Sequence, residues 1–265
     1  MILVSRWLYY LSSIPTLFAG IKNWQTMLQV FLGISVPKPI LIVLKNGLRF
    51  HVRTPMDIWV LKEACIDHQY ERAGVVIQDN WNIIDVGAGL GDFAASVAKE
   101  HPRSTVYAYE PFPESFELLQ ENLRTNRIEN VKAFPFAIGA QTGSAQLHAV
   151  SAEAVQQSTV APIDERNAIQ VKSVTLDQVL ADLSLSRCDY LKMDCEGAEY
   201  GVFFNASPAT LEKIERICLE YHDGVTSHNH DELVRFFELN GFEVDCTSNP
   251  AHRDLGLLFA TRKRA

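Results

Sequence analysis

The chain has 265 residues, of which 47% are hydrophobic and 21% are charged, and its eleven prolines are spread along the sequence. This composition excludes collagenous, intrinsically disordered and disulfide-rich proteins. The length fits one large α/β domain with an N-terminal extension.

Charge is distributed unevenly along the chain, whose formal net charge is −8. The first 56 residues carry no acidic side chain and six basic ones: Arg6, Lys22, Lys38, Lys45, Arg49 and Arg53. The remaining residues hold 18 basic and 32 acidic side chains, a balance of −14. An acidic surface repels phosphates, so we expect no nucleic-acid partner.

The five cysteines are odd in number and form no Cys-x-x-Cys pair: Cys65, Cys188, Cys195, Cys218 and Cys246. That pattern argues against a zinc ribbon, a thioredoxin-like motif and a disulfide framework. We interpret these cysteines as small buried apolar residues in a reducing cytoplasm.

The segment Trp7–Ile21 is free of charge and rich in aromatic and aliphatic residues. It is shorter than the roughly 20 apolar residues of a spanning helix, and Pro15 interrupts it. Ala19-Gly20 is a poor match to a signal-peptide cleavage site, so we expect a cytoplasmic protein. Residues 1–35 can pack on the rest of the protein, contact a second subunit or lie on an anionic membrane, and we favour packing within the protein or between subunits over membrane contact.

The next residues predict a β-hairpin and a helix. Apolar runs flank Asn46-Gly47 within Ile40–Arg53, and this dipeptide tolerates the positive φ angles of a tight hairpin turn. Helical spacing follows over Met56–Ile66. We therefore divide the chain into an N-terminal extension, residues 1–70, and a catalytic domain, residues 71–265.

Strands and helices alternate through the catalytic domain. The expected strands are Trp81–Val86, Thr105–Glu110, Val131–Ile138, Tyr190–Asp194, Ile217–His222, Phe242–Cys246 and Leu257–Thr261. The expected helices are Asp92–Glu100, Pro113–Thr125, Thr175–Leu183 and His230–Asn240. This order predicts an α/β fold with a doubly wound, mostly parallel, Rossmann-like sheet of seven strands. Ser151–Gln170 fits no element, and we interpret it as a substrate loop.

A glycine-rich turn follows the first of these strands. Asp85 ends the strand, and we expect the turn Gly87, Ala88, Gly89 and Gly91 to let the backbone approach a ligand closely. A dinucleotide turn would carry a third glycine three places after Gly89, where this chain has Asp92, and an acid there would oppose a pyrophosphate.

Glu110 ends the next strand, where an acid accepts hydrogen bonds from ribose hydroxyls. Glu110 alone does not say which nucleoside is bound. Asp85 favours a ligand with positive charge, such as a sulfonium, although by itself it could be a turn residue bonded to nearby backbone N–H groups.

Several segments, taken in order, resemble the FkbM family of methyltransferases: Asp85–Gly91, Tyr109–Leu123, Thr175–Asp177, Leu191–Glu199 and Leu219–His222. The resemblance runs from about residue 80 to residue 241. It implies a class I methyltransferase sheet, S-adenosylmethionine as methyl donor, and transfer to a hydroxyl oxygen of a sugar, glycan or natural product. Small departures occur at Gly89-Leu90 and at Cys195. With the resemblance, we expect Pro111, Phe112, Ala137 and Asp194 to contact the cofactor.

Ionisable side chains follow the fourth and fifth strands, where ligands bind in such sheets. We expect Asp194, Glu220 and His222 to be catalytic, with His222 as the base that removes the hydroxyl proton and a carboxylate that orients it. His222 could instead only cap a strand or bond a backbone carbonyl. The same groups could hold Mg²⁺ or Mn²⁺, but no spacing demands a metal, and we expect none.

The sequence therefore predicts an O-methyltransferase that acts on a small molecule or glycan. A dinucleotide-dependent oxidoreductase and a non-catalytic scaffold that keeps the fold are the alternatives. No recognisable motif identifies the acceptor.

Overall fold

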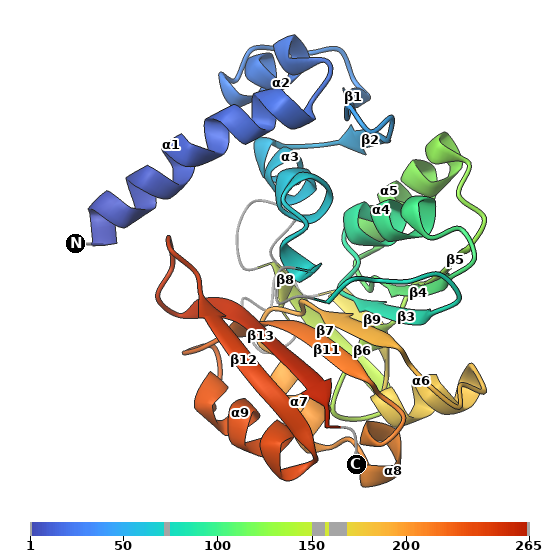
Figure 1. The fold of residues 1–265 in the computed structure, drawn as a ribbon. Coiled ribbons are helices and arrows are strands. Elements are labelled where there is room, and N and C mark those ends of the chain that lie inside the picture. The colour runs from blue at the N-terminus through green and yellow to red at the C-terminus, as the bar shows by residue number, and fades with distance from the viewer. Residues whose placement is uncertain (1, 72–74, 150–156, 159–168, 264–265) are drawn as a thin grey trace.

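The computed structural model describes residues 2–71, 75–149, 157–158 and 169–263. A seven-stranded sheet forms its centre, in the order β12-β13-β11-β10-β3-β4-β5 (Figure 1). All strands are parallel except β13, which runs antiparallel to both of its neighbours. The bounds are β3 Asn82–Val86, β4 Thr105–Tyr109, β5 Val131–Phe134, β10 Tyr190–Met193, β11 Arg216–His222, β12 Phe242–Ser248 and β13 Leu255–Arg262. The predicted sheet is confirmed.

Two apolar layers cover the faces of this sheet. Consecutive residues of a strand point to opposite faces, and in β3 Ile83 belongs to one buried cluster while Ile84 belongs to the other. The first cluster includes side chains of α3 (Pro55–Leu61), α4 (Asp92–Glu100) and α5 (Pro113–Asn126). The second includes side chains of α6 (Leu176–Asp182), α7 (Glu199–Phe204), α8 (Pro208–Leu211) and α9 (His230–Leu239).

The N-terminal region forms helices α1 (Ile2–Gly20) and α2 (Trp24–Phe31), followed by the predicted hairpin of β1 (Ile40–Val43) and β2 (Arg49–Val52). Leu17 and Met27 join the first buried cluster, so this region packs on the same core as the sheet. The side chain of Asn122 on α5 accepts a hydrogen bond from the His51 amide and donates one to the Leu90 carbonyl. These bonds attach the hairpin to the turn after β3.

Pro15 does not end the first helix, contrary to the expected interruption. α1 continues through it to Gly20. A proline removes one helical hydrogen bond, and burial of Leu17 and Ile21 in the following turn offsets that loss. Among the described residues, no helix is both long and apolar enough to cross a bilayer.

After α3 the chain continues in a π-helical turn, Lys62–Ile66. The predicted helix of residues 56–66 therefore forms, but it changes from α-helix to π-helix after Leu61. A short 3₁₀ helix follows at Gln69–Glu71.

The predicted strand Val131–Ile138 is wrong as one element, because it divides at Pro135. Proline lacks the N–H that a strand ladder needs, so β5 ends at Phe134. The chain then enters a second sheet of order β6-β9-β7-β8. Its strands are β6 Ala137–Ile138, β7 Gly143–Ala149, β8 Gln157–Ser158 and β9 Ile169–Val174.

Strands β7 and β9 and the short helices α7 and α8 were not predicted from the sequence. Most of the proposed substrate loop Ser151–Gln170 lies outside the described residues. Cys65, Cys188 and Cys218 are buried as expected, Cys195 is half-buried, and Cys246 on β12 is exposed. The expected burial is therefore wrong for Cys246.

Candidate active site

A cavity of about 710 Å³ lies beside the carboxyl ends of β3, β4, β10 and β11. Parallel strands bring the residues that follow each of them to one edge of the sheet. Residues from all four strand ends line the cavity: Gly87, Gly89, Glu110, Asp194, Glu220 and His222.

Gly87 occupies a position that only glycine fits. Its φ angle is +70°, and a Cβ added there would lie 1.8 Å from the backbone oxygen of Asp194. The close approach of this turn to the end of β10 therefore depends on the missing side chain. No L-residue with a side chain could keep both the turn and the neighbouring strand in place.

Glu110 is held in a fixed orientation by backbone amides. The Gly89 amide donates to Oε2 at 2.7 Å, and the Phe112 amide donates to Oε1 at 2.8 Å. Burial raises the pKa of Glu110 to about 7, against the lowering effect of these two hydrogen bonds. Each carboxylate oxygen has further lone pairs, so Glu110 can still accept hydrogen bonds from a ligand in the cavity.

Asp85 faces a cation of the chain itself. Lys192 Nζ lies 3.1 Å from Asp85 Oδ1 and donates a hydrogen bond to the Gly87 carbonyl at 2.8 Å. Asp85 is fully buried and does not line the cavity. Burial raises the pKa of Asp85, and the charge of Lys192 opposes that rise. The positive charge beside Asp85 is therefore Lys192, whose role was not predicted from the sequence.

The other residues expected at the cofactor divide into two groups. Pro111, Ala137 and Asp194 line the cavity together with Gly87, Gly89 and Glu110. Ala88, Gly91 and Phe112 are buried and do not line the cavity, like Asp85. Gly91 is the N-cap of α4, with a φ angle of +85° and no side-chain cap. Asp92 follows it, lines the cavity and is buried, which raises its pKa to about 7.

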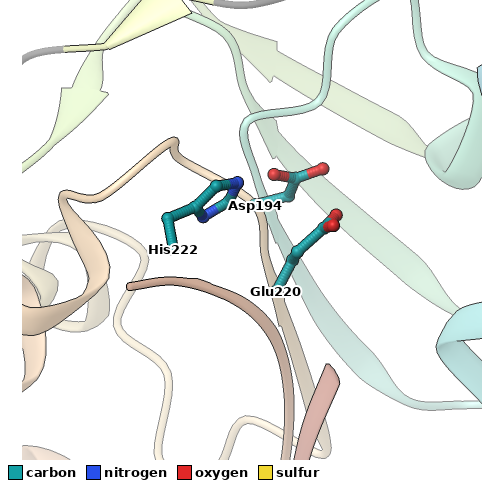
Figure 2. A group of neighbouring side chains, drawn as sticks. All are labelled: Asp194, Glu220 and His222. Carbon is teal, nitrogen blue, oxygen red and sulfur yellow. The ribbon is translucent and has the colours of Figure 1, made fainter. Parts of the chain in front are cut away.

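Asp194, Glu220 and His222 converge at the ends of β10 and β11 (Figure 2). One ligand atom from each of the three lies within 4.8 Å of the other two. Asp194 Oδ2 also accepts a hydrogen bond from the Tyr70 hydroxyl at 3.2 Å. Two carboxylate oxygens and one imidazole nitrogen are ligands that suit Mg²⁺ or Mn²⁺, so this cluster could also hold such an ion.

His222 is oriented by Glu199 of α7, a residue whose role was not predicted from the sequence. Its Nδ1 lies 3.2 Å from Glu199 Oε1, and this oxygen also accepts from the His222 amide at 2.9 Å. The Nε2 atom lies 3.3 Å from Glu196 Oε2. Contact with two carboxylates removes the alternative that His222 only bonds a backbone carbonyl.

The acids around His222 also set its charge. Burial favours the neutral imidazole, but the hydrogen bond to Glu199 and the negative charges of Glu199, Glu196 and Asp194 outweigh it and raise the pKa to about 10. Burial raises the pKa of Glu220 well above its usual range, and the charge of Asp194 adds to this effect. The cluster therefore surrounds His222 with acids that keep a proton on its imidazole at neutral pH.

Aromatic side chains from the N-terminal region form another part of the cavity wall. Tyr9 of α1 and Trp59 of α3 line it, and both donate hydrogen bonds to Glu63 Oε1, at 2.7 Å and 2.8 Å. Burial raises the pKa of Glu63, against these hydrogen bonds. No local pattern predicts this wall, because it joins residues 50 positions apart from two helices.

Residues 85–244 match the sequence family described as Methyltransferase FkbM domain. AmbE, the AMB antimetabolite synthetase of Pseudomonas aeruginosa, is 29% identical over 224 residues. That match covers 70% of this chain but only 10% of AmbE, so the chain spans a small part of that protein.

Two further relatives match most of their own length. The 31-O-demethyl-FK506 methyltransferase FkbM of Streptomyces tacrolimicus is 24% identical over 237 residues, which cover 78% of this chain and 90% of that protein. The hexuronic acid methyltransferase AglP of Haloferax volcanii is 21% identical over 187 residues, which cover 70% of this chain and 75% of that protein. The crystal structure of Methyltransferase FkbM from Methylobacillus flagellatus shares the fold, with a TM-score of 0.52, 14% identity, and coverage of 90% of this chain and 58% of that one.

Proposed function

Because this chain belongs to the FkbM family of methyltransferase domains, we propose that it methylates a hydroxyl oxygen of a sugar, glycan or natural product. S-adenosylmethionine is the methyl donor, and when bound it supplies a methyl group on a positively charged sulfur. The family match favours this activity over the dinucleotide-dependent oxidoreductase. The observation that carries the proposal is the convergence of Glu110, Asp194, Glu220 and His222 on one cavity.

The donor site that we propose lies at the ends of β3, β4 and β10. Glu110 accepts the ribose hydroxyls, and the side-chain-free turn at Gly87 and Gly89 leaves room for the ligand. Pro111, Ala137 and Asp194 complete the contact surface. Asp85, Ala88, Gly91 and Phe112 support it from behind. The acids of the lining suit a ligand that carries sulfonium and ammonium charges.

Two relatives support a hydroxylated acceptor. One is named for 31-O-demethyl-FK506 and the other for hexuronic acid. In this chain the cavity combines acids with the aromatic side chains of Tyr9, Tyr10 and Trp59. Aromatic faces cover the apolar C–H surfaces of a ring, and acids accept its hydroxyl hydrogens.

His222 is the base that we propose, with Asp194 and Glu220 beside it as further catalytic residues. At neutral pH the raised pKa keeps a proton on its imidazole. A positive charge beside Asp194 and Glu196 would offset the negative charges that raise this pKa. We therefore infer that His222 becomes a proton acceptor in the complex with the methyl donor, while Glu199 keeps the ring oriented.

The test compares His222→Ala with His101→Ala, a change at the C-cap of α4, at the opposite end of that helix from the glycine turn. Both variants are assayed for S-adenosylhomocysteine release with a panel of sugars and hydroxylated metabolites. We expect His222→Ala to keep donor affinity and to lose roughly 10²–10⁴-fold in kcat, the range for a missing general base. His101→Ala should behave as wild type.

Wild-type turnover should decline as the pH falls through the pKa that His222 has in the donor complex. The turnover of His222→Ala should not show this decline at low pH. Near-normal turnover of His222→Ala would contradict the base assignment. Loss of activity on chelation, restored by Mg²⁺, would assign Asp194, Glu220 and His222 to a metal instead. Donor binding without turnover on any acceptor would support the scaffold alternative.

We also propose that residues 71–265 form the catalytic unit in the cytoplasm, and that residues 1–70 complete its cavity. Tyr9, Phe31 and Trp59 of the extension line the cavity, which supports this division.

A further inference from the structure

The exposed surface of α1 and α2 is unusually apolar. Eight of the twelve large apolar side chains that are exposed in the described part of the chain fall between residues 11 and 34. They are Leu11, Ile14, Phe18, Trp24, Leu28, Phe31, Leu32 and Ile34, and we call them the α1–α2 surface. Soluble proteins rarely expose contiguous apolar surface without a binding role.

The α1–α2 surface is continuous across the two helices. Leu11, Ile14 and Phe18 recur at helical spacing on α1, whereas Leu17 between them is buried. The rings of Phe18 on α1 and Trp24 on α2 lie with their centroids 5.5 Å apart. Both helices lie at the end of the molecule opposite α8 and α9 (Figure 1). Their outer faces therefore form one surface.

Charge indicates which partner covers this surface. Lys22 lies between the two helices, and Lys38 follows the surface in the chain; both are exposed. No acidic residue occurs before Asp57, which is buried and paired with Arg53. Apolar and aromatic side chains bordered by lysines match the acyl and anionic headgroup layers of a membrane surface. A symmetric contact between two copies would bring like charges together instead.

We propose that the α1–α2 surface docks the protein on an anionic lipid bilayer, with α1 and α2 lying in the interface. Phe31 is exposed at 39% and also lines the cavity, so the apolar surface reaches the edge of the cavity at this residue. Docking places that edge at the lipid surface. The proposal concerns binding alone and does not depend on methyl transfer.

The test measures sedimentation of the full chain with vesicles of phosphatidylcholine, with and without phosphatidylglycerol. We expect binding to the anionic vesicles that weakens as salt rises. Leu28→Asp and Leu32→Asp should each reduce the partition coefficient about tenfold or more. The control is Leu239→Asp, because Leu239 is 87% exposed and is the last residue of α9, a helix that lies far from α1 and α2 in Figure 1. It should bind as wild type.

Brominated lipids provide a second readout. They should quench wild-type tryptophan fluorescence, and Trp24→Phe should remove part of this quenching while Trp81→Phe, a change in the buried core, should not. No binding to anionic vesicles by folded wild-type protein would overturn the proposal. If the wild-type chain self-associates and binds no vesicles, and Leu32→Asp converts it to a monomer, the surface binds a second copy of the chain instead. Methyltransferase activity plays no part in either readout, so failure here leaves the proposed function standing.

Discussion

The ammonium of Lys192 lies 3.1 Å from Asp85 Oδ1, and neither side chain is more than 4% exposed. This ion pair joins β10 to β3 beneath the glycine turn, where Lys192 also holds the Gly87 carbonyl. Burial disfavours the charge on Lys192, but the surrounding acids, Asp85 first, outweigh it and raise its pKa. Lys192 therefore keeps its charge beside Asp85 and holds the turn that follows β3.

Lys192→Met should destabilise the protein by about 3–5 kcal/mol, because it leaves the Asp85 carboxylate buried without a partner. Urea unfolding measures this change. Lys132→Met, at an exposed position on β5, should have little effect. Adding Asp85→Asn to Lys192→Met should recover part of the loss, and the coupling follows from a double-mutant cycle. If Lys192→Met has the same free energy of unfolding as the wild type, the Asp85–Lys192 ion pair does not stabilise the fold.

Gly87→Ala should be severely destabilising, by about 2 kcal/mol or more, and should abolish donor binding. The added methyl would meet the Asp194 backbone oxygen at 1.8 Å at a φ angle of +70°. Gly201→Ala in α7 is the matched control, because its Cβ would only touch the Ala140 methyl at 3.5 Å. Replacing a glycine by alanine within a helix usually stabilises the protein by up to ~1 kcal/mol. Thermal unfolding of both variants, with titration calorimetry, tests the prediction; equal behaviour of the two would contradict it.

Glu110→Gln should weaken binding of S-adenosylhomocysteine by about 1.5–3 kcal/mol, because the charge-assisted bonds to ribose are lost. Since the pKa of Glu110 is raised to about 7, the wild-type carboxylate takes up a proton as the pH falls through that value. Donor affinity should therefore fall below pH 7, and the variant should lose this dependence. Calorimetry across pH measures both effects, with Glu114→Gln, an exposed position on α5, as control. Wild-type affinity in Glu110→Gln would remove Glu110 from the site.

The unliganded protein should be more stable at pH 5.5 than at pH 8 because of its buried acids. Asp92 has a folded-state pKa of about 7 against an ordinary value of 3.8, so the folded state binds its proton more tightly than the unfolded state does. That stabilisation is complete below the ordinary pKa and is lost as the pH rises through 7.

Asp92→Asn should remove on the order of 2 kcal/mol of this decline in the free energy of unfolding between pH 5.5 and 8. Glu238→Gln, at an exposed position on α9, should leave the decline unchanged. Denaturant unfolding at both pH values measures it. A variant whose pH dependence matches that of wild type would show that Asp92 does not titrate in this range.

Local sequence patterns predicted the central sheet and the glycine turn that follows its first strand. Alternating apolar segments and glycine turns are local features, so the strand ends at Val86 and Tyr109, and helix α4 from Asp92 to Glu100, could be predicted within a residue or two. Glu110 was identified for the same reason, since a residue that follows a parallel strand reaches the ligand edge wherever the rest of the chain lies. Pro135 was the local signal that should have divided the predicted strand of residues 131–138.

What these side chains face, and therefore how they are charged, depends on tertiary packing. Lys192 meets Asp85, and Glu199 meets His222, because strands and helices far apart in the sequence pack together. A pKa depends on burial and on such neighbours, so the proton that His222 holds at neutral pH could not be inferred from residue type. The aromatic wall of Tyr9 and Trp59 has the same origin, because helices α1 and α3 meet only in the folded chain.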